Sequence, residues 1–392
     1  MNKKLEGELL LYCLGIGTDK IKPARLEQLS TSEWEEIIQQ SDRNGVAPLL
    51  YLRLKALDQC ITIPGTTIPN SVLQRLRKKY VCNAWKNKRL YHELSKVLSL
   101  FQNDGIPVIV LKGAALAELV FQNIALRPMG DVDLIVKSKD WSKIDTILLQ
   151  LGFSNVTPPL RSKRHIQWIQ HIKHMSKVTL YEIHPEIYEL QNHNPWLTAS
   201  PATIAATDTL ILGSEDFLLH LCLHIDRHLR EGITKLIWWF DIAMGIKHYR
   251  KELNWDYVIQ IAKKHKVEGS VHRILYVINE WFDGQVPANV LNRLKDDSIP
   301  LSFLDVLQQV PLQNREFDLF LTDISRIPSI HDKIYYGFKT FFPCREFIIQ
   351  TYSVTRPNLV YFYYFIHISI IAIKAFYQLP RYLFNKYVSL RA

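Results

Sequence analysis

The chain has 392 residues, of which 47% are hydrophobic, so it is long enough for two or three globular domains. Its 48 Lys and Arg residues against 38 Asp and Glu residues give a formal charge of +10, which favours polyanionic partners such as NTP phosphates, nucleic acid or an anionic membrane face. The five cysteines are odd in number and lack CxxC spacing, which excludes a zinc ribbon and a disulfide framework. These features, and an N-terminal run unlike a signal peptide, predict a cytoplasmic protein.

The first hundred residues predict a helical region. The segment 32–57 begins with a capping-box pattern, in which Ser32 is followed three residues later by Glu35. The segment 72–103 repeats apolar side chains at helical spacing, and Asp104-Gly105 then ends the expected helix. We therefore assign 1–100 to a helical N-terminal region.

Residues 101–200 predict a small module of strands and helices. Strands are expected at 106–111, 133–136 and 177–184, with helices at 114–121 and 141–151 between them. From Ser214 onward the pattern is helical nearly to the end of the chain. The expected fold class is therefore α+β, with a small mixed-sheet core at 101–200, the helical arm before it and a helical C-terminal domain at 201–392.

Two carboxylates open the second expected strand. Asp131 and Asp133 are two residues apart, so in a strand both side chains point to the same face. Carboxylates at that distance repel each other unless a cation lies between them, and Mg²⁺ is commonly held by one or two carboxylates together with substrate phosphates. Upstream, Gly113 follows the first strand and opens a helix, an arrangement that is typical of phosphate sites. The segment therefore indicates nucleotide chemistry.

At this point the sequence resembles a known family. The order of its elements resembles that of the nucleotidyltransferase superfamily, which has the DNA polymerase β-like fold. In that order, a strand ends in a glycine turn, a helix follows, the next strand carries an Asp-x-Asp pair, and a later strand carries a third acidic residue. More narrowly, the chain is similar to proteins described as "nucleotidyltransferase family protein". That likeness covers most of residues 30–350 and is carried by LKGAAL, RPMGDVDLIV, LGF, EIH, WEEIIQQSDRNGVAPLLYLRL, SEDFLLHLCLH and KLIWWFDIA. It implies that the core at 101–200 is a nucleotidyltransferase core.

The resemblance also implies roles for single residues. Asp131 and Asp133 would be ligands of Mg²⁺, with two ions expected, and Glu182 would be the third carboxylate, which also helps to activate the acceptor. Gly113 would lie under the phosphates of the NTP. One departure concerns the next residue, because the superfamily usually has Gly-Gly or Gly-Ser where this chain has Gly113-Ala114.

Two basic residues near this motif are further candidates. Lys112 and Arg127 are candidate phosphate partners by their charge, and each could instead be an ordinary surface charge. His184 is on the same face of the third strand as Glu182, where it supports the carboxylates or belongs to the edge of the core.

Three functions remain open at this stage. The first is a Mg²⁺-dependent nucleotidyltransferase that moves a nucleoside monophosphate from an NTP to an unidentified small molecule, peptide or protein. The alternative is a catalytically weak nucleotide-binding or antitoxin-like protein that keeps the nucleotidyltransferase fold, and Gly113-Ala114 is the reason to consider it. A nucleic-acid-binding module would fit the charge of +10, but no known nucleic-acid-binding motif supports it. The sequence names neither the base, the acceptor nor the oligomeric state.

Histidines gather at two places in the sequence. His220, His224 and His228 recur every four residues and would share one face of a helix, as in zinc sites that use two histidines. The stretch HLCLH lacks the glutamate of a zinc protease, so we expect packed histidines without metal. A second group comprises His165, His171 and His174. These residues form either a basic lid over the phosphate site or an ordinary basic surface.

The segment 357–373 contains no formally charged residue. It is shorter than the roughly 20 apolar residues that a membrane span needs, and it includes His367. We expect a helix packed on the helical domain, with its tyrosine rings inward and no transmembrane span. The alternative is peripheral membrane contact, in which the basic residues that follow attract anionic lipid: Lys374, Arg381, Lys386 and Arg391.

Overall fold

A computed structural model gives the fold as α+β, as expected. The structure describes residues 3–18, 26–59, 68–155, 166–171, 178–187, 190, 192–230 and 232–295, with 303–304, 334, 338, 341–342, 345, 348, 352 and 357–372. The chain forms two compact units: the first comprises 1–140 and 186–311, and the second comprises 141–185 and 312–392. The division into regions 1–100, 101–200 and 201–392 stays a prediction.

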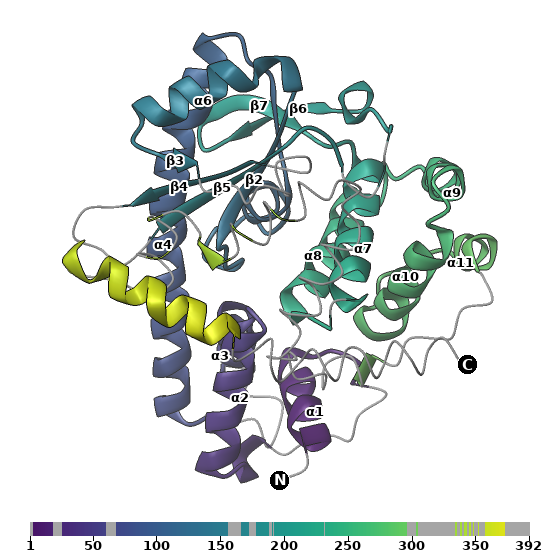
Figure 1. The fold of residues 1–392 in the computed structure, drawn as a ribbon. Coiled ribbons are helices and arrows are strands. Elements are labelled where there is room, and N and C mark those ends of the chain that lie inside the picture. Colours follow the sequence, from purple (N-terminus) through teal and green to yellow (C-terminus); the bar gives the residue numbers. More distant parts are fainter. Residues whose placement is uncertain are drawn as a thin grey trace, which may run out of the picture. The chain divides into compact units, whose positions relative to one another are not determined.

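The N-terminal part of the first unit is helical, as predicted. Its helices are α1 (Lys3–Leu14), α2 (Thr31–Arg43), α3 (Ala47–Asp58) and α4 (Asn70–Asn103), with a short 3₁₀ turn η1 (Leu26–Gln28) before α2. The long α4 stands out in Figure 1. It ends at Asp104, where Gly105 adopts a left-handed φ of +66°, so the predicted helix end is confirmed.

The predicted capping box of α2 is displaced by two residues. Ser30 is the N-cap: its Oγ accepts a hydrogen bond from the Glu33 N–H (3.3 Å), and the Glu33 carboxylate accepts one from the Ser30 N–H (2.7 Å). The prediction of Ser32 and Glu35 was wrong because both pairs have the same three-residue spacing. The earlier pair starts the helix, and Glu35 instead forms an ion pair with Arg75 of α4.

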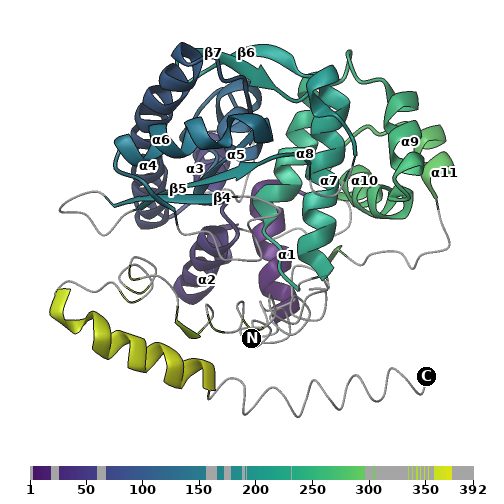
Figure 2. The same ribbon diagram turned by 45° about the horizontal axis from the view of Figure 1, so that its top comes forward.

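The first unit holds a mixed sheet of four strands. They are β1 (Val108–Val110), β2 (Asp131–Val136), β6 (Ser200–Ile204) and β7 (Thr207–Ile211), in the order β2-β1-β7-β6. β1 is antiparallel to β2 and parallel to β7, and β6 and β7 form the antiparallel hairpin that Figure 2 shows. Between β1 and β2 lie the short helix α5 (Lys112–Ala115) and the π-helical turn η2 (Leu116–Val120). The hairpin was not predicted.

Helices complete the first unit after the hairpin. They are α7 (Ser214–Arg230), α8 (Leu236–Tyr249), α9 (Trp255–Lys264), α10 (Glu268–Phe282) and α11 (Ala288–Leu294), and a short turn η5 (Pro195–Leu197) precedes the hairpin. Helices α7 and α8 lie side by side in both ribbon views (Figures 1 and 2). The predicted helical character from Ser214 onward is confirmed for these helices.

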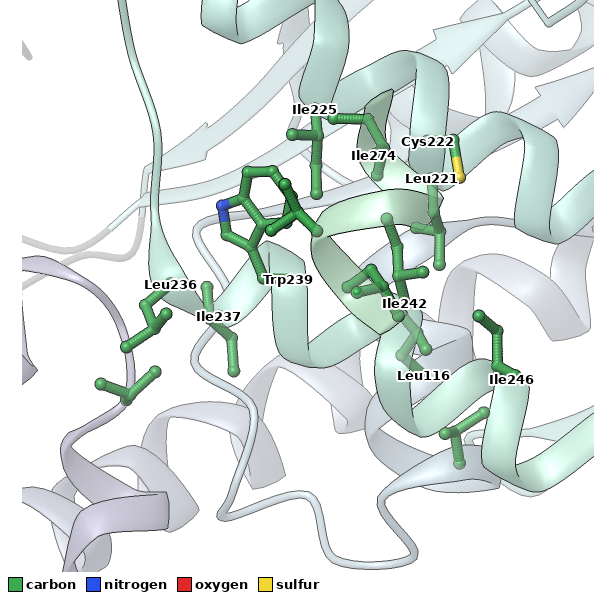
Figure 3. Close-up of a cluster of buried hydrophobic side chains, with 14 of the residues drawn as sticks. Leu116, Leu221, Cys222, Ile225, Leu236, Ile237, Trp239, Ile242, Ile246 and Ile274 are labelled. Carbon is green, nitrogen blue, oxygen red and sulfur yellow. The ribbon is translucent and has the colours of Figure 1, made fainter. Parts of the chain in front are cut away.

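One hydrophobic cluster joins these helices to η2, the turn that follows Gly113 and α5. Figure 3 shows Leu116 of η2 next to Ile242 of α8, with Leu221 of α7 and Ile274 of α10 in the same cluster. The exposed fractions of Leu116, Ile242 and Ile274 are 0%. Burying such side chains contributes about 1.5–3 kcal/mol each. The core therefore fixes the segment that follows Gly113, and this in turn holds Lys112 and Gly113 in place.

The second unit has a helix and a small antiparallel sheet. Helix α6 (Trp141–Gln150) confirms the predicted amphipathic helix, and the strands β3 (Ser154–Asn155), β4 (Ile166–His171) and β5 (Val178–His184) follow in spatial order. β5 confirms the third predicted strand, whereas β4 falls among the histidines for which a basic lid is one interpretation. His171 is the last residue of β4, and His165 and His174 lie outside the described residues.

The second unit also contains the C-terminal helix. A 3₁₀ turn η6 (Pro357–Leu359) leads into a helix over 360–372, drawn in yellow in Figure 1. None of the helices in the described ranges is long and apolar enough to cross a membrane. The expectation that its tyrosine rings point inward is wrong for Tyr361, which is exposed, and Phe362 and Phe365 are exposed as well.

Candidate functional site

The paired aspartates begin a strand that is otherwise buried. Asp131 is the first residue of β2 and is half-buried, whereas Asp133 is 4% exposed. The Leu111 N–H donates a hydrogen bond to the Asp133 carbonyl oxygen (3.0 Å), just beyond the last ladder pair of β1 with β2. This bond brings the end of β1 and the start of β2 together. The segment that follows β1 therefore begins beside the aspartates.

Lys112 lies at that junction and contacts Asp133 directly. Its Nζ is 3.0 Å from Asp133 Oδ1, and the two side chains are only 12% and 5% exposed. The backbone of Lys112 has a left-handed φ of +43°, which is uncommon for a residue other than glycine. The structure thus places Lys112, a candidate phosphate partner, against Asp133, a candidate metal ligand. The positive charge of Lys112 offsets the negative charge of Asp133.

Arg127 forms a second buried ion pair, with a residue that the sequence did not single out. Its Nη2 and Nε donate to Asp241 Oδ2 (2.7 Å) and Oδ1 (3.3 Å), and Nη1 donates to the Pro128 carbonyl oxygen (3.1 Å). Burial alone would lower the pKa of Arg127, but Asp241, followed by Asp131 and Asp133, raises it above the ordinary value. Arg127 is therefore a buried cation held by Asp241, not a surface charge.

Asp241 had a signal in the sequence that could have identified it. It is the one charged residue within the apolar run LIWWFDIAMG of α8, and it is 1% exposed. A buried acid needs a cationic or hydrogen-bonding partner. Nothing in the local pattern indicated which of the many basic residues that partner would be, because Arg127 is far away in the sequence.

Gly113 is a glycine because other side chains approach it closely. Its φ is not left-handed, but a Cβ there would lie 2.5 Å from Arg127 Nη1 and 2.9 Å from Met129 Cγ. The need for glycine at this position is therefore steric. Arg127 and Met129 occupy the space that a side chain at position 113 would fill.

We expect Gly113→Ala to destabilise the protein by about 1–3 kcal/mol, because the added methyl group overpacks the contact with Arg127 and Met129. Urea unfolding of the full chain measures this loss. Gly130→Ala is the matched control, since a Cβ at Gly130 meets nothing within 4 Å. Equal stability of the two variants would contradict the steric role of Gly113.

One face of α4 holds the loop between α5 and β2. Asn83, Asn87 and Tyr91 are spaced four residues apart, so they share one face of the helix. They donate to backbone carbonyl oxygens of Ala125 (2.7 Å), Ile124 (2.5 Å), Arg127 (2.8 Å) and Ala114 (2.5 Å). Ala114 is 1% exposed, so its methyl group is packed inside. These bonds fix the path of the chain from the glycine motif to Arg127.

Glu182 and His184 lie on β5 in the second unit. Tyr181 and Ile183 are buried at 0% and 1%, whereas Glu182 and His184 on the opposite face are half-buried. Their carboxylate and imidazole approach to 4.0 Å, between Glu182 Oε2 and His184 Nε2. The predicted alternation along this strand is confirmed. Asp131, Asp133, Lys112 and Arg127 belong to the first unit.

The histidines of α7 pack against one another and against an aromatic ring. The His224 and His228 ring centroids are 4.5 Å apart, and both rings contact Trp238 of α8. His224 Nδ1 is 3.2 Å from Arg227 Nη2. Burial, followed by the charge of Lys112, lowers the pKa of His224 well below its ordinary value, so this ring is neutral at pH 7.

We expect His220 and His224 to bind no zinc. The Arg227 guanidinium occupies one nitrogen of His224 with a positive charge, which opposes a second cation there. Metal analysis of the purified protein should find no stoichiometric zinc that depends on these rings. Zinc at one equivalent, lost in His220→Ala, would contradict the prediction.

A comparison with known protein families identifies the family of this chain. A family model described as "Uncharacterised nucleotidyltransferase" matches residues 30–283, which include the paired aspartates, Glu182 and Asp241. No curated protein matches the chain. A solution structure of the antibiotic-resistance factor ANT(2'')-Ia is 14% identical and covers 46% of this chain and 92% of its own, but its TM-score of 0.34 is too low to support an assignment. Because the family model spans well over half of the chain, the protein belongs to the family of uncharacterised nucleotidyltransferases.

Proposed function

We propose that this protein is a Mg²⁺-dependent nucleotidyltransferase, which moves a nucleoside monophosphate from an NTP to a hydroxyl, phosphate or amine of a small molecule, peptide or protein. The observation that carries this proposal is the pair Asp131 and Asp133 at the start of β2, beside Lys112, in a chain of a nucleotidyltransferase family. We also propose a cytoplasmic location, where the NTP substrate is available.

The metal would be held by carboxylates. We propose Asp131, Asp133 and Glu182 as ligands of two Mg²⁺ ions, because oxygen donors are what Mg²⁺ prefers. Glu182 enters this set through the resemblance to the family, in which a later acidic residue is the third carboxylate, and through its place on the same face of β5 as His184. When bound, the ions would lower the pKa of the acceptor group and stabilise the charge on the departing pyrophosphate.

The protein's own groups would bind and orient the reactants. We propose that backbone groups of Gly113 and Ala114, with the charges of Lys112 and Arg127, face the triphosphate. The acceptor oxygen or nitrogen forms a bond to the α-phosphorus while the bond from that phosphorus to pyrophosphate breaks. Glu182 takes the acceptor proton. Asp241 keeps Arg127 in place, so the charge of Arg127 is fixed before the substrate arrives.

Pyrophosphate release tests this function. The full chain is incubated with each common NTP, with and without Mg²⁺ and with a cell extract as the source of acceptor, and pyrophosphate is measured. We expect release that requires both Mg²⁺ and one preferred NTP. The absence of Mg²⁺-dependent release with every NTP would contradict a transferase function.

A second candidate function is favoured by one contact. Lys112 Nζ already neutralises Asp133, and the buried methyl group of Ala114 offers no hydroxyl to a phosphate. A chain with these features could bind a nucleotide and turn it over poorly, as a catalytically weak or antitoxin-like protein. Saturable NTP binding in calorimetry without pyrophosphate release would favour this alternative.

We predict that Glu182 comes within metal-bridging reach of Asp131 and Asp133. Glu182→Gln should then weaken Mn²⁺ binding, followed by paramagnetic resonance, about as much as Asp133→Asn does, because each removes one anionic ligand. Glu93→Gln is the control, since Glu93 lies on α4 and forms an ion pair with Lys96 of the same helix. Mn²⁺ affinity that is unchanged in Glu182→Gln but reduced in Asp133→Asn would exclude Glu182 from the site.

A further inference from the structure

The C-terminal helix over 360–372 has two faces that differ in burial. On one face, Val360 is 1% exposed, and the His367 Nδ1 lies 2.9 Å from the Tyr352 hydroxyl. The Tyr363 ring stacks on the Tyr352 ring with centroids 5.6 Å apart. Positions 360, 363 and 367 recur at helical spacing, so this face is already occupied by contacts within the second unit.

The opposite face carries three large aromatic rings without cover. Tyr361 is 83% exposed, Phe362 is 60% exposed and Phe365 is 69% exposed. Positions 361, 362 and 365 share one side of the helix, because residues three and four apart are neighbours on a helix surface. This helix is yellow in Figure 1. Single exposed hydrophobic residues are ordinary on protein surfaces, but three neighbouring rings on one helix face mark an interaction surface.

We propose that this aromatic face, defined by Tyr361, Phe362 and Phe365, binds the surface of an anionic lipid membrane. Aromatic rings favour the boundary between lipid headgroups and acyl chains. No described helix is suited to span a bilayer, so the helix would lie in the plane of the interface. The inference uses no residue of the candidate nucleotide site and is independent of the proposed function.

The charge of the neighbouring sequence selects anionic lipid as the partner. Residues 357–373 contain no Asp, Glu, Lys or Arg, and residues 374–392 contain four basic residues and no acidic one: Lys374, Arg381, Lys386 and Arg391. Basic residues close to an anionic bilayer are attracted to its surface. A second copy of the chain would carry the same positive charges, and like charges repel.

Vesicle sedimentation tests this proposal with the full chain. We expect the protein to pellet with vesicles of phosphatidylcholine and phosphatidylglycerol, and not with pure phosphatidylcholine vesicles, at near-physiological salt. Replacing the three rings (Y361S/F362S/F365S) should weaken partitioning by about tenfold or more, because each ring loses its interfacial burial. Replacing the four basic residues by Gln should abolish the preference for anionic lipid.

The control variant is Trp85→Ser, because Trp85 of α4 is similarly exposed at 71% but belongs to the first unit. It should bind vesicles as the unchanged protein does. Circular dichroism verifies that the triple variant is folded. The proposal is overturned if the unchanged protein does not pellet with anionic vesicles, or if the triple variant pellets equally well. Self-association that the triple variant abolishes, without vesicle binding, would assign the face to a protein contact instead.

Discussion

Replacement of Asp131 or Asp133 by Asn is expected to abolish Mg²⁺-dependent NTP turnover while leaving the fold intact. Asn has nearly the same shape but no charge, so each variant removes an anionic ligand from the metal site proposed at the start of β2. If the metal contributes several kcal/mol to transition-state stabilisation, turnover falls by about two or more orders of magnitude. Pyrophosphate release from the preferred NTP measures the loss.

The two variants should differ in stability. Asp133→Asn leaves the largely buried Lys112 ammonium facing a neutral amide, whereas Asp131 is less buried. We therefore expect a lower melting temperature for Asp133→Asn and a smaller change for Asp131→Asn. Asp256→Asn is the control, because Asp256 is 78% exposed and pairs with Arg293 on the surface. Turnover in either site variant equal to that of the control would refute the proposed ligands.

The second large effect concerns the ion pair between Arg127 and Asp241. Removing one partner leaves the other as a buried charge without compensation, which costs about 3–5 kcal/mol. We expect Asp241→Asn and Arg127→Met each to reduce the free energy of unfolding by that amount. Urea unfolding of the full chain provides the measurement. Turnover should fall as well, since Arg127 contacts the segment that leads to Asp131.

A double-mutant cycle of Arg127→Met, Asp241→Leu and their combination separates the pair from its surroundings. The combined variant R127M/D241L contains no buried charge at this place, so it should be more stable than either single variant. The surface pair of Arg293 with Asp256 gives the scale, because exposed pairs contribute only about 0.2–1 kcal/mol. A loss in Asp241→Asn as small as that in Asp256→Asn would show that the buried pair is not a structural anchor.

Features fixed by neighbouring residues could be predicted from the sequence. The end of α4 at Asp104-Gly105 depends on a left-handed glycine, and β1 and β5 depend on runs of apolar or alternating side chains. β6 and β7 were missed because residues 200–211 mix Ser, Thr and Ala with few large apolar side chains. Their strand form depends on the pairing of β7 with β1, a contact about a hundred residues away in the sequence.

The candidate site likewise has features that depend on sequence neighbours and features that depend on distant contacts. Asp131 and Asp133 could be predicted because a strand places both on one face, and two acids there imply a cation. The partners of Lys112 and Arg127 could not, because each ion pair is made across the fold. The contacts of Gly113 likewise come from Arg127 and Met129, so its sequence neighbours gave only a turn. Glu182 stays a prediction from the resemblance to the family.

The left-handed backbone of Lys112 has an energetic consequence for the whole molecule. A lysine at φ +43° costs about 1 kcal/mol relative to a relaxed conformation, and glycine would avoid most of that cost. Glycine, however, has no ammonium group to set against Asp133. The fold therefore keeps a locally unfavourable conformation in exchange for a fixed positive charge. Replacing Lys112 by glycine would remove the backbone strain and the ammonium group together. A variant that gains stability and loses turnover would then measure how far the two properties oppose each other in this chain.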